Sequence, residues 1–487
     1  MPTPFSFPST MTRTHAIAQA AAHFDRGDFF RTLQTLVACP TECQEPSRSA
    51  SLHDYLTEQL APRLQALGFE CQILPNPIAE APPFMVARRI EADAAFTVLG
   101  YGHGDVVLGH AGQWRENRSP WELQADGDRW YGRGAADNKG QHVINLTALA
   151  EVIAARQGRL GYNVTWIFEM GEEIGSPGLN AFCARHAELL RADLFLASDG
   201  PRLGATKPTV FLGSRGGFTF ELRLDLREGA HHSGNWGGLL RNPAWRLAHA
   251  LASLVDAHGR ILVPGLLPRE LPANVRAALR DVQVASDPGD PAIDPDWGEP
   301  GLTPAEQVFG WNTLEILAFT AGNPEAPVNA IPGSARAMCQ IRFVVGSDDD
   351  HFLQHIRAHL DAHGFDDVQV AQSGELFRAT RLDPDSPWVR LALQSLAQTT
   401  GKSPTLLPNL GGSLPNDVFS ETLGLPTVWV PHSYPACSQH APNEHLLGSV
   451  AREGLQIMAG LYWDLAEQGG AIAQAVRQQH DAEVLAK

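Results

Sequence analysis

The sequence predicts an α/β fold in which a doubly wound, mixed-sheet domain is interrupted by an inserted α+β domain. Three observations support this prediction. Short apolar runs alternate with helical stretches up to about Gly200, which is typical of a doubly wound sheet. Near Gly213 the pattern changes, and residues 218–226 alternate apolar and polar side chains as a half-exposed antiparallel strand does. Beyond about Arg381 the first pattern returns.

The doubly wound domain is expected to comprise residues 13–212 and 379–487. Residues 15–37 and 51–67 space apolar side chains at helical intervals, and residues 138–155 predict a further helix. Four short apolar runs are typical of buried parallel strands, and they lie at residues 96–101, 164–168, 194–197 and 426–430.

The inserted domain is expected to comprise residues 213–378 and to hold a sheet with helices. A helix that contains Trp245 follows its first strand. Further strands are predicted at residues 312–319, 335–345 and 368–370, with a helix over 350–362 before the last of them. Residues 258–310 are rich in Pro, Gly and Asp, which predicts a long irregular insertion.

Composition excludes several classes of partner. The chain has 487 residues and a formal net charge of −17, so nucleic acid and anionic membrane surfaces are not expected partners. No apolar stretch approaches the length that spans a membrane, and we expect no secretory signal. The six cysteines are scattered, which predicts free thiols in a reducing compartment and a cytoplasmic location.

Histidine and carboxylate residues follow the apolar runs where the predicted strands end. Ligands in open α/β sheets gather beyond the carboxyl ends of strands, so these residues are expected to share one edge. Taken alone, each has an ordinary interpretation, such as a helix N-cap for Asp137 or a turn former for Asp199. Together, two histidines and three carboxylates suit a paired metal site, and they are His103, Asp137, Glu173, Asp199 and His440.

Two further acidic residues complete the predicted site. Asp105 lies two residues after His103, on the same face of a strand, where its carboxylate can hold the second imidazole nitrogen. Glu172 is the carboxylate left over from the ligand set, and a metal hydrolase needs such a group as its general base. We expect two divalent metal ions per chain, with Zn²⁺ favoured and Mn²⁺ or Co²⁺ as alternatives.

Four motifs occur in an order that resembles a known family. They are Gly-His-Gly-Asp-Val-Val, Trp-Tyr-Gly-Arg-Gly-Ala-Ala-Asp-Asn-Lys-Gly, Gly-Glu-Glu-Ile-Gly-Ser and His-Ala-Pro-Asn-Glu. The chain resembles the dinuclear zinc exopeptidases and deacylases, which include glutamate carboxypeptidase, carnosinase-type dipeptidases, acetylornithine deacetylase and succinyl-diaminopimelate desuccinylase. The resemblance runs from the predicted helix at residue 51 to the helix after residue 446.

The resemblance implies a role for each residue of the metal site. His103 and Asp199 hold one metal ion, Glu173 and His440 hold the other, and Asp137 bridges them. Glu172 takes the position of the general base. The peptide bond between Asp137 and Asn138 is expected to be cis, as it often is in the family.

The resemblance also implies that the inserted domain is a lid and dimerisation domain. Its His-His-Ser-Gly stretch places His232 as the histidine that reaches a neighbouring subunit's active site, although Ala230 and His231 replace the family's Asp-Leu pair. The implied substrate contacts are Arg215, Asn329, Arg342, Gly411, Gly412 and Ser413.

The predicted function is therefore metal-dependent hydrolysis of an amide bond in a dipeptide or similar small substrate. Arg342 is expected to bind a free substrate carboxylate. Two metal ions activate a water molecule, Glu172 removes its proton, and one metal together with His232 stabilises the oxyanion. The alternatives are an N-acyl amino acid deacylase and, more remotely, a non-catalytic scaffold on the same fold. A homodimer formed through the inserted domain is expected.

Overall fold

The computed structural model describes residues 12–285 and 290–485, which form two compact units. The first unit comprises the chain up to Phe211, Asp385–Leu406 and the chain from Val418 onward. The second unit comprises Leu212–Pro384 and Leu407–Asp417. Each unit is described by itself below.

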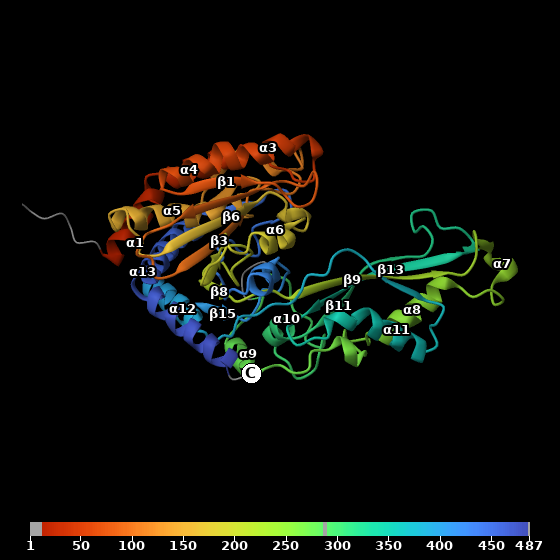
Figure 1. Cartoon of the computed structure of the whole chain (residues 1–487). Helices are drawn as coiled ribbons and strands as arrows, with labels where there is room; N and C mark the ends of the chain where they lie inside the picture. The colour runs from red at the N-terminus through yellow and green to blue at the C-terminus, as the bar shows by residue number, and fades with distance from the viewer. Residues whose placement is uncertain (1–11, 286–289, 486–487) are drawn as a thin grey trace, which may run out of the picture. The chain divides into compact units, whose positions relative to one another are not determined.

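An eight-stranded mixed sheet forms the centre of the first unit (Figure 1). Its order is β1 (Glu70–Leu74), β2 (Phe84–Arg89), β6 (Asn163–Glu169), β3 (Thr97–His103), β7 (Leu194–Ala197), β16 (Thr427–Trp429), β8 (Thr209–Phe211) and β15 (Thr405–Leu407). The central strands β6, β3, β7 and β16 pair in parallel, whereas β1, β2 and β8 pair antiparallel. The four predicted apolar runs are these four parallel strands, so the predicted mixed sheet is confirmed.

Helical segments cover both faces of this sheet. Neighbouring residues of a strand point to opposite faces, as Gly102 and Tyr101 of β3 do. On the Gly102 face, α5 (Lys139–Ala155) packs so closely that a Cβ at this glycine would lie 2.8 Å from the Cβ of His142. On the other face, Tyr101 packs edge-on against Phe419, which belongs to the helical turn Val418–Thr422. This arrangement is the predicted doubly wound architecture.

The remaining elements of the first unit surround the sheet. Helix α13 (Gly448–Leu485) packs against α1 (Arg13–Asp25), α12 (Pro387–Thr400) and α5, and α1 also packs against α5. The shorter helices are α2 (Asp28–Val37), α3 (Ser49–Asp54), α4 (Ala61–Ala66) and α6 (Leu179–Arg185). A small sheet of β4 (Gln124–Asp126), β5 (Arg129–Tyr131) and β17 (His445–Leu447) brings the C-terminal His-Ala-Pro-Asn-Glu loop beside the segment that leads to Asp137.

A four-stranded antiparallel sheet forms the centre of the second unit. Its order is β11 (Thr313–Thr320), β13 (Ser334–Phe343), β9 (Gly216–Asp225) and β14 (Gln369–Gln372). Helices α8 (Pro243–Leu254) and α11 (Phe352–Ala362) lie on one side of it (Figure 1). Apolar side chains of β9 and β13, such as Phe220, Leu222 and Ile341, fill the core on that side. Strands β10 (His231–His232) and β12 (Ala330–Ile331) form a separate two-stranded sheet. The short helix α7 (Ser233–Trp236) directly follows β10.

The segment 258–310 is less irregular than its composition predicts. Its described residues, 258–285 and 290–310, contain two short α-helices, α9 (Ala273–Leu279) and α10 (Pro304–Gly310), and a 3-10 turn at Pro264–Leu266. Helix α10 forms because Thr303 and Glu306 make a reciprocal capping box and Pro304 occupies the first helical turn. The prediction of irregular structure was therefore wrong for these two stretches.

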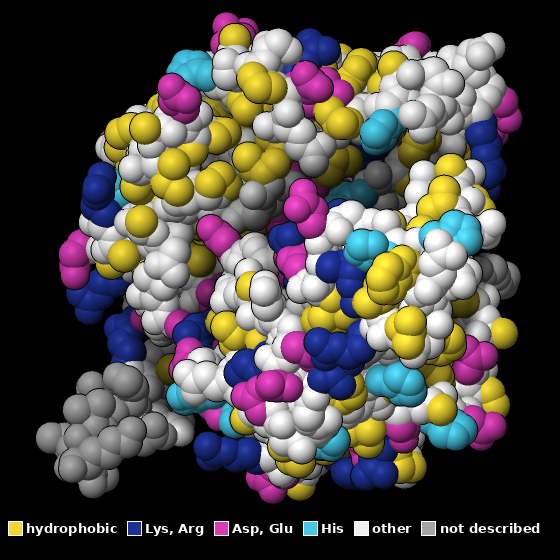
Figure 2. Space-filling view, turned by 90° about the vertical axis from the view of Figure 1, so that its right-hand side faces the viewer, with side chains coloured by type: hydrophobic (Ala, Val, Ile, Leu, Met, Phe, Trp, Pro, Cys, Tyr) yellow, Lys and Arg dark blue, Asp and Glu magenta, His cyan; other side chains and the backbone are white. Residues whose placement is uncertain are grey.

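Charge on the surface is mixed in sign. On the face seen in Figure 2, acidic and basic side chains are interspersed with apolar ones. None of the helices in the described part of the chain combines the length and apolar character that a membrane crossing requires.

Candidate metal centre

The five predicted metal ligands lie at the ends of elements of the first unit. His103 is the last residue of β3, and Asp199 follows the end of β7. Glu173 lies in the short turn after β6, and Asp137 lies just before α5. His440 lies in the loop before β17. Because β3, β6 and β7 are parallel neighbours, their carboxyl ends open at one edge of the sheet.

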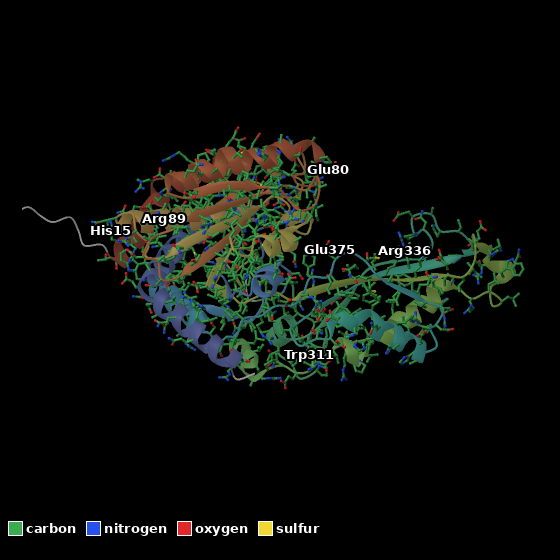
Figure 3. The ribbon with its side chains drawn as sticks, in the orientation of Figure 1. His15, Glu80, Arg89, Trp311, Arg336 and Glu375 are labelled. Atoms are coloured by element: carbon green, nitrogen blue, oxygen red, sulfur yellow. The ribbon has the colours of Figure 1, made fainter. Side chains whose placement is uncertain are left out.

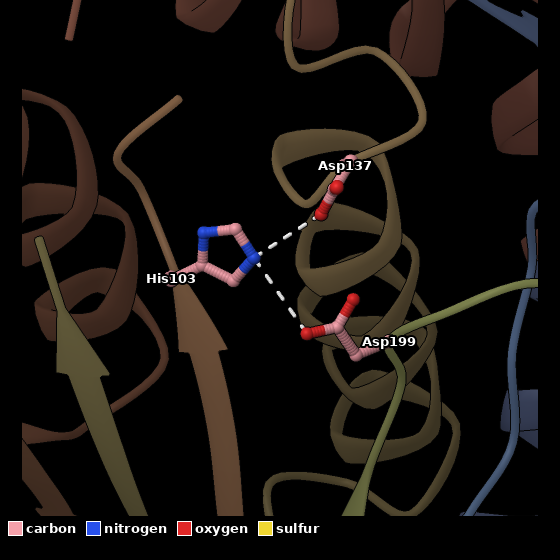
Figure 4. A group of neighbouring side chains, drawn as sticks. All are labelled: His103, Asp137 and Asp199. Carbon is pink, nitrogen blue, oxygen red and sulfur yellow. Dashed lines mark ion pairs between the residues drawn. The ribbon is translucent and has the colours of Figure 1, made fainter. Parts of the chain in front are cut away.

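Asp137 joins these residues into two groups of possible metal ligands. One group is His103, Asp137 and Asp199, and the other is Asp137, Glu173 and His440. Figure 4 shows the first group, in which His103 Nε2 lies 3.2 Å from Asp137 Oδ1 and 3.6 Å from Asp199 Oδ2. In the second group, His440 Nε2 lies 2.9 Å from Asp137 Oδ2 and 3.0 Å from Glu173 Oε2. The two oxygens of one carboxylate thus face two different histidines.

Burial and neighbouring charges shift the pKa values of all five groups. Burial raises the pKa of Asp199 to about 6 and that of Glu173 to about 7. Burial acts in the same direction on Asp137, but the neighbouring imidazoles of His103 and His440 hold its pKa well below the ordinary range. Hydrogen bonds to Asp137 and Glu173 raise the pKa of His440 to about 11. Packing so many carboxylates together is costly unless positive charge offsets it.

The chemistry of this donor set fits divalent metal ions. His103 is fully buried, and its Nε2 has no hydrogen-bond partner although it points between two carboxylates. Buried polar atoms are normally satisfied, so this one is aimed at something that accepts a nitrogen lone pair. Imidazole nitrogen with carboxylate oxygen is a donor set for Zn²⁺ and, because carboxylates are hard ligands, for Mn²⁺ or Co²⁺. The peptide bond between Asp137 and Asn138 is cis, as expected.

Asp105 connects ligands of the two groups. The Nδ1 atom of His103 lies 3.2 Å from the backbone oxygen of Asp105 and 3.4 Å from its Oδ1. The Oδ2 atom of Asp105 accepts a hydrogen bond from the backbone N–H of Glu173 at 3.0 Å. Asp105 therefore orients the imidazole of one group and the backbone of the other, which is how residues behind metal ligands act.

Glu172 lies among the ligands but belongs to neither group. Burial, together with the negative charges of Asp199 and Glu173, raises its pKa well above the ordinary range. A carboxylate in this position can exchange a proton with a molecule held between the ligands. The geometry thus offers a proton acceptor beside two groups of metal ligands.

Glu444 is a functional residue that reasoning from the sequence missed. It is buried, and its Oε1 accepts hydrogen bonds from the backbone N–H groups of Ala136 and Asp137 at 3.0 and 3.1 Å. Its Oε2 accepts from the Gly134 N–H and from Arg133 Nη1, the latter at 2.7 Å. Glu444 therefore fixes the loop that presents Asp137. Its place in His-Ala-Pro-Asn-Glu, four residues after His440, is the signal that could have indicated it.

We expect Glu444→Gln to weaken metal binding. An amide places an N–H group against backbone donors, so the loop around Asp137 loses its fixed position. Changing residues that hold metal ligands lowers metal affinity about 10–100-fold. Competition with a chromophoric chelator measures this affinity, and exposed Glu421→Gln is the matched control. Equal affinities of the Glu444→Gln and Glu421→Gln proteins would show that the loop does not depend on Glu444.

Most predicted substrate contacts come together in the second unit. Arg342 Nη1 donates to Ser413 Oγ at 2.6 Å, and Ser413 Oγ donates to the backbone oxygen of Arg215 at 2.8 Å. Arg215 Nε donates to the backbone oxygen of Gly411 at 2.8 Å. Gly412 lies between Gly411 and Ser413 in the same loop.

The other two predicted residues, His232 and Asn329, also lie beside each other in the second unit. His232 is exposed, and in the pairing of β10 with β12 it lies opposite Ala330. Asn329 is the residue directly before Ala330. The backbone oxygen of Asn329 accepts from the Ser233 N–H at 2.8 Å. The Nδ1 atom of His232 accepts from the Gly234 N–H at 3.1 Å.

Comparison with known proteins identifies the family and agrees with the fold. The sequence model described as Peptidase family M20/M25/M40 matches residues 99–464. The cysteinylglycine-S-conjugate dipeptidase of Corynebacterium striatum is 26% identical over 407 residues, which are 80% of this chain and 85% of that protein. The human Beta-Ala-His dipeptidase is 30% identical over 260 residues, which are 50% of each protein.

Solved structures share the fold over most of their length. A metallo-carboxypeptidase of the M20 family from Sulfolobus solfataricus superimposes with a TM-score of 0.75 and 24% sequence identity. The match covers 90% of this chain and 99% of that structure. The likeness establishes the fold.

Proposed function

The chain belongs to peptidase family M20/M25/M40 and is an enzyme that hydrolyses peptide bonds; from the site geometry we propose that it cleaves dipeptides with a free carboxylate at a two-metal centre. Zn²⁺ is the proposed metal, with Mn²⁺ or Co²⁺ as alternatives. The Corynebacterium striatum and human relatives are both described as dipeptidases, which supports the size of the substrate.

The observation that carries this proposal is the position of Asp137. One of its oxygens lies 3.2 Å from His103 Nε2 and the other lies 2.9 Å from His440 Nε2. Each histidine has a further carboxylate beside it, from Asp199 and Glu173 respectively. A carboxylate with a ligand pair on each side is what a bridge between two cations requires. A site for a single metal ion would need only one of these two ligand pairs.

The residues of the chain divide the proposed reaction among them. The two ligand groups would hold two divalent cations, which would supply a water molecule of lowered pKa and would polarise the scissile carbonyl. Glu172 accepts the proton of that water and then delivers it to the leaving amine. Asp105 holds His103 in one orientation throughout. Arg342, whose guanidinium is held by Ser413, binds the terminal carboxylate of the substrate.

A substrate panel tests this proposal. Dipeptides and N-acyl amino acids are offered to the purified enzyme with and without a chelator. We expect hydrolysis of dipeptides that carry a free carboxylate, loss of that activity with the chelator, and recovery when Zn²⁺ is added back. Hydrolysis of N-acyl amino acids alone would identify a deacylase instead, and hydrolysis that survives the chelator would contradict the proposal.

A homodimer formed through the second unit is the proposed assembly. Strand β11 lies at the edge of its sheet, and Ile316, Leu317 and Phe319 on it are 51%, 57% and 43% exposed. Trp245 on α8 is 69% exposed. An edge strand with exposed apolar side chains is a surface that proteins normally cover. The exposed His232 of the same unit is proposed to act in the partner's active site.

The six free thiols support a reducing compartment such as the cytoplasm.

Mixing two inactive variants tests whether His232 acts across the dimer. His232→Ala and Glu172→Ala proteins are combined and allowed to exchange subunits. If His232 acts in trans, each mixed dimer contains one complete site, so about a quarter of all sites regain activity after random exchange. No recovery, with exchange verified by mass spectrometry of tagged chains, would show that His232 acts within its own chain or only packs.

A further inference from the structure

The two groups of metal ligands differ in how deeply their members are buried. In the first group the side chains of His103, Asp137 and Asp199 are 0%, 5% and 3% exposed. In the second group the side chain of His440 is 54% exposed. An exposed side chain is held by little packing, and fixing it in one rotamer costs conformational entropy. The position of His440 therefore depends strongly on the loop that carries it.

This loop before β17 has an unusual backbone at its tip. Its base is closed by a hydrogen bond at 2.9 Å from the His445 N–H to the backbone oxygen of Cys437. At the tip, Ser438 and His440 have φ values of 58° and 60°, in the left-handed region that residues other than glycine seldom adopt. Neighbouring side chains on an extended backbone point to opposite sides, but left-handed residues turn the chain sharply. Gln439, between these two residues, can therefore point to the same place as His440.

Gln439 and His440 contact the same oxygen atom. The Nε2 group of Gln439 donates to Asp137 Oδ2, which is the oxygen that lies 2.9 Å from His440 Nε2. Asp137 is itself held in place, because Glu444 accepts a hydrogen bond from its backbone N–H at 3.1 Å. The amide of Gln439 thus joins the tip of the loop to a carboxylate whose position is fixed.

This contact has the features of a support for a metal ligand. Ligands of metal ions are normally held by hydrogen bonds to residues that do not bind the ion. Each carboxylate oxygen has two acceptor sites, so Asp137 Oδ2 can accept from Gln439 and still face a cation. Of the five proposed ligands, only His440 lies on this loop. Loss of the contact would therefore disturb the second group more than the first.

We propose that Gln439 is a positioning residue for the metal ion of the second group, because its hydrogen bond to Asp137 holds His440 where it can bind that ion. The inference rests on the proposed function, in which the two groups hold two metal ions. Removing the amide is expected to lower the affinity for the ion of the second group about 10–100-fold, as for other residues that hold metal ligands. The ion of the first group keeps its affinity.

Two ligand variants isolate the two groups for a test. Asp199→Ala leaves the second group complete, and His440→Ala leaves the first group complete. In each background the affinity for the tighter-bound Zn²⁺ is measured with and without Gln439→Met, by competition with a chromophoric chelator. Methionine is unbranched like glutamine but has no N–H group. We expect a loss of about 10–100-fold in the Asp199→Ala background and no change in the His440→Ala background.

An equal loss in both backgrounds, or no loss in the Asp199→Ala background, would overturn the proposal. Gln124→Met is the matched control, since Gln124 is a half-buried glutamine on β4 that belongs to neither group. His15→Ala is the control for removal of a histidine, because His15 lies on α1 and also belongs to neither group (Figure 3). An unchanged affinity of the first group shows at the same time that the Gln439→Met protein is folded.

Turnover at saturating Zn²⁺ separates positioning from a direct part in the reaction. If Gln439 only positions His440, excess Zn²⁺ should restore the kcat and KM of Gln439→Met for a dipeptide to the wild-type values. A KM that stays raised at saturating Zn²⁺ would identify Gln439 as a substrate contact and would overturn the proposal.

The same measurements separate this inference from the proposed function. A wild type that binds two ions and hydrolyses dipeptides, with a Gln439→Met variant that binds both ions equally well, would refute the inference alone. The expected pattern of affinities in protein that hydrolyses no dipeptide would support the role of Gln439 and contradict the proposed function.

Discussion

Glu172→Ala is expected to remove turnover while the protein keeps both metal ions. Glu172 belongs to neither ligand group, so its loss leaves His103, Asp137, Glu173, Asp199 and His440 in place. Removing a general base lowers the rate by about 10²–10⁴-fold or more. Turnover of a dipeptide and metal content by inductively coupled plasma mass spectrometry are measured on the same preparation.

The neighbouring glutamate is the control for this result. Glu173 lies 3.0 Å from His440 Nε2 and is a proposed ligand, so Glu173→Ala should lose metal as well as activity. The two substitutions differ by one position along the chain and remove the same chemical group. Loss of metal from the Glu172→Ala protein would mean that the two glutamates share or exchange their roles.

Asp137→Ala is expected to have the second large effect, because it damages both ligand groups at once. Changes to residues that only support metal ligands cost about 10–100-fold in affinity, so loss of a shared ligand should cost more than that for each ion. Asp199 belongs to one group only, and Asp199→Ala should therefore weaken one ion selectively. Stepwise titration with Zn²⁺ distinguishes the two variants. If Asp137→Ala weakens a single ion and leaves the other unchanged, Asp137 is not a bridge.

The parallel core of the fold could be predicted because its strands are buried on both faces. Such strands are continuous apolar runs, as Leu194–Ala197 shows. The antiparallel strands at the sheet edge leave a weaker signal. Glu70–Leu74 mixes exposed and half-buried residues, and no periodicity separates it from a loop. Helix α10 was missed because the Pro and Gly content of the whole segment outweighed a local capping box.

The metal ligands could be proposed from the sequence because metal coordination needs particular side chains after particular strands. Glu444 could not, because it acts on backbone N–H groups of a loop about 300 positions earlier in the chain. Every residue except proline carries a backbone N–H group, so the sequence does not show which of these groups Glu444 contacts.

The number of metal ions that one chain binds tests the central claim most directly. Metal-free wild-type protein is titrated with Zn²⁺ in competition with a chromophoric chelator, and hydrolysis of a dipeptide is followed in the same samples. The two ligand groups that share Asp137 predict two bound ions per chain, with full activity only when both are present. A single bound ion at full activity, or activity in protein that binds none, would contradict the account.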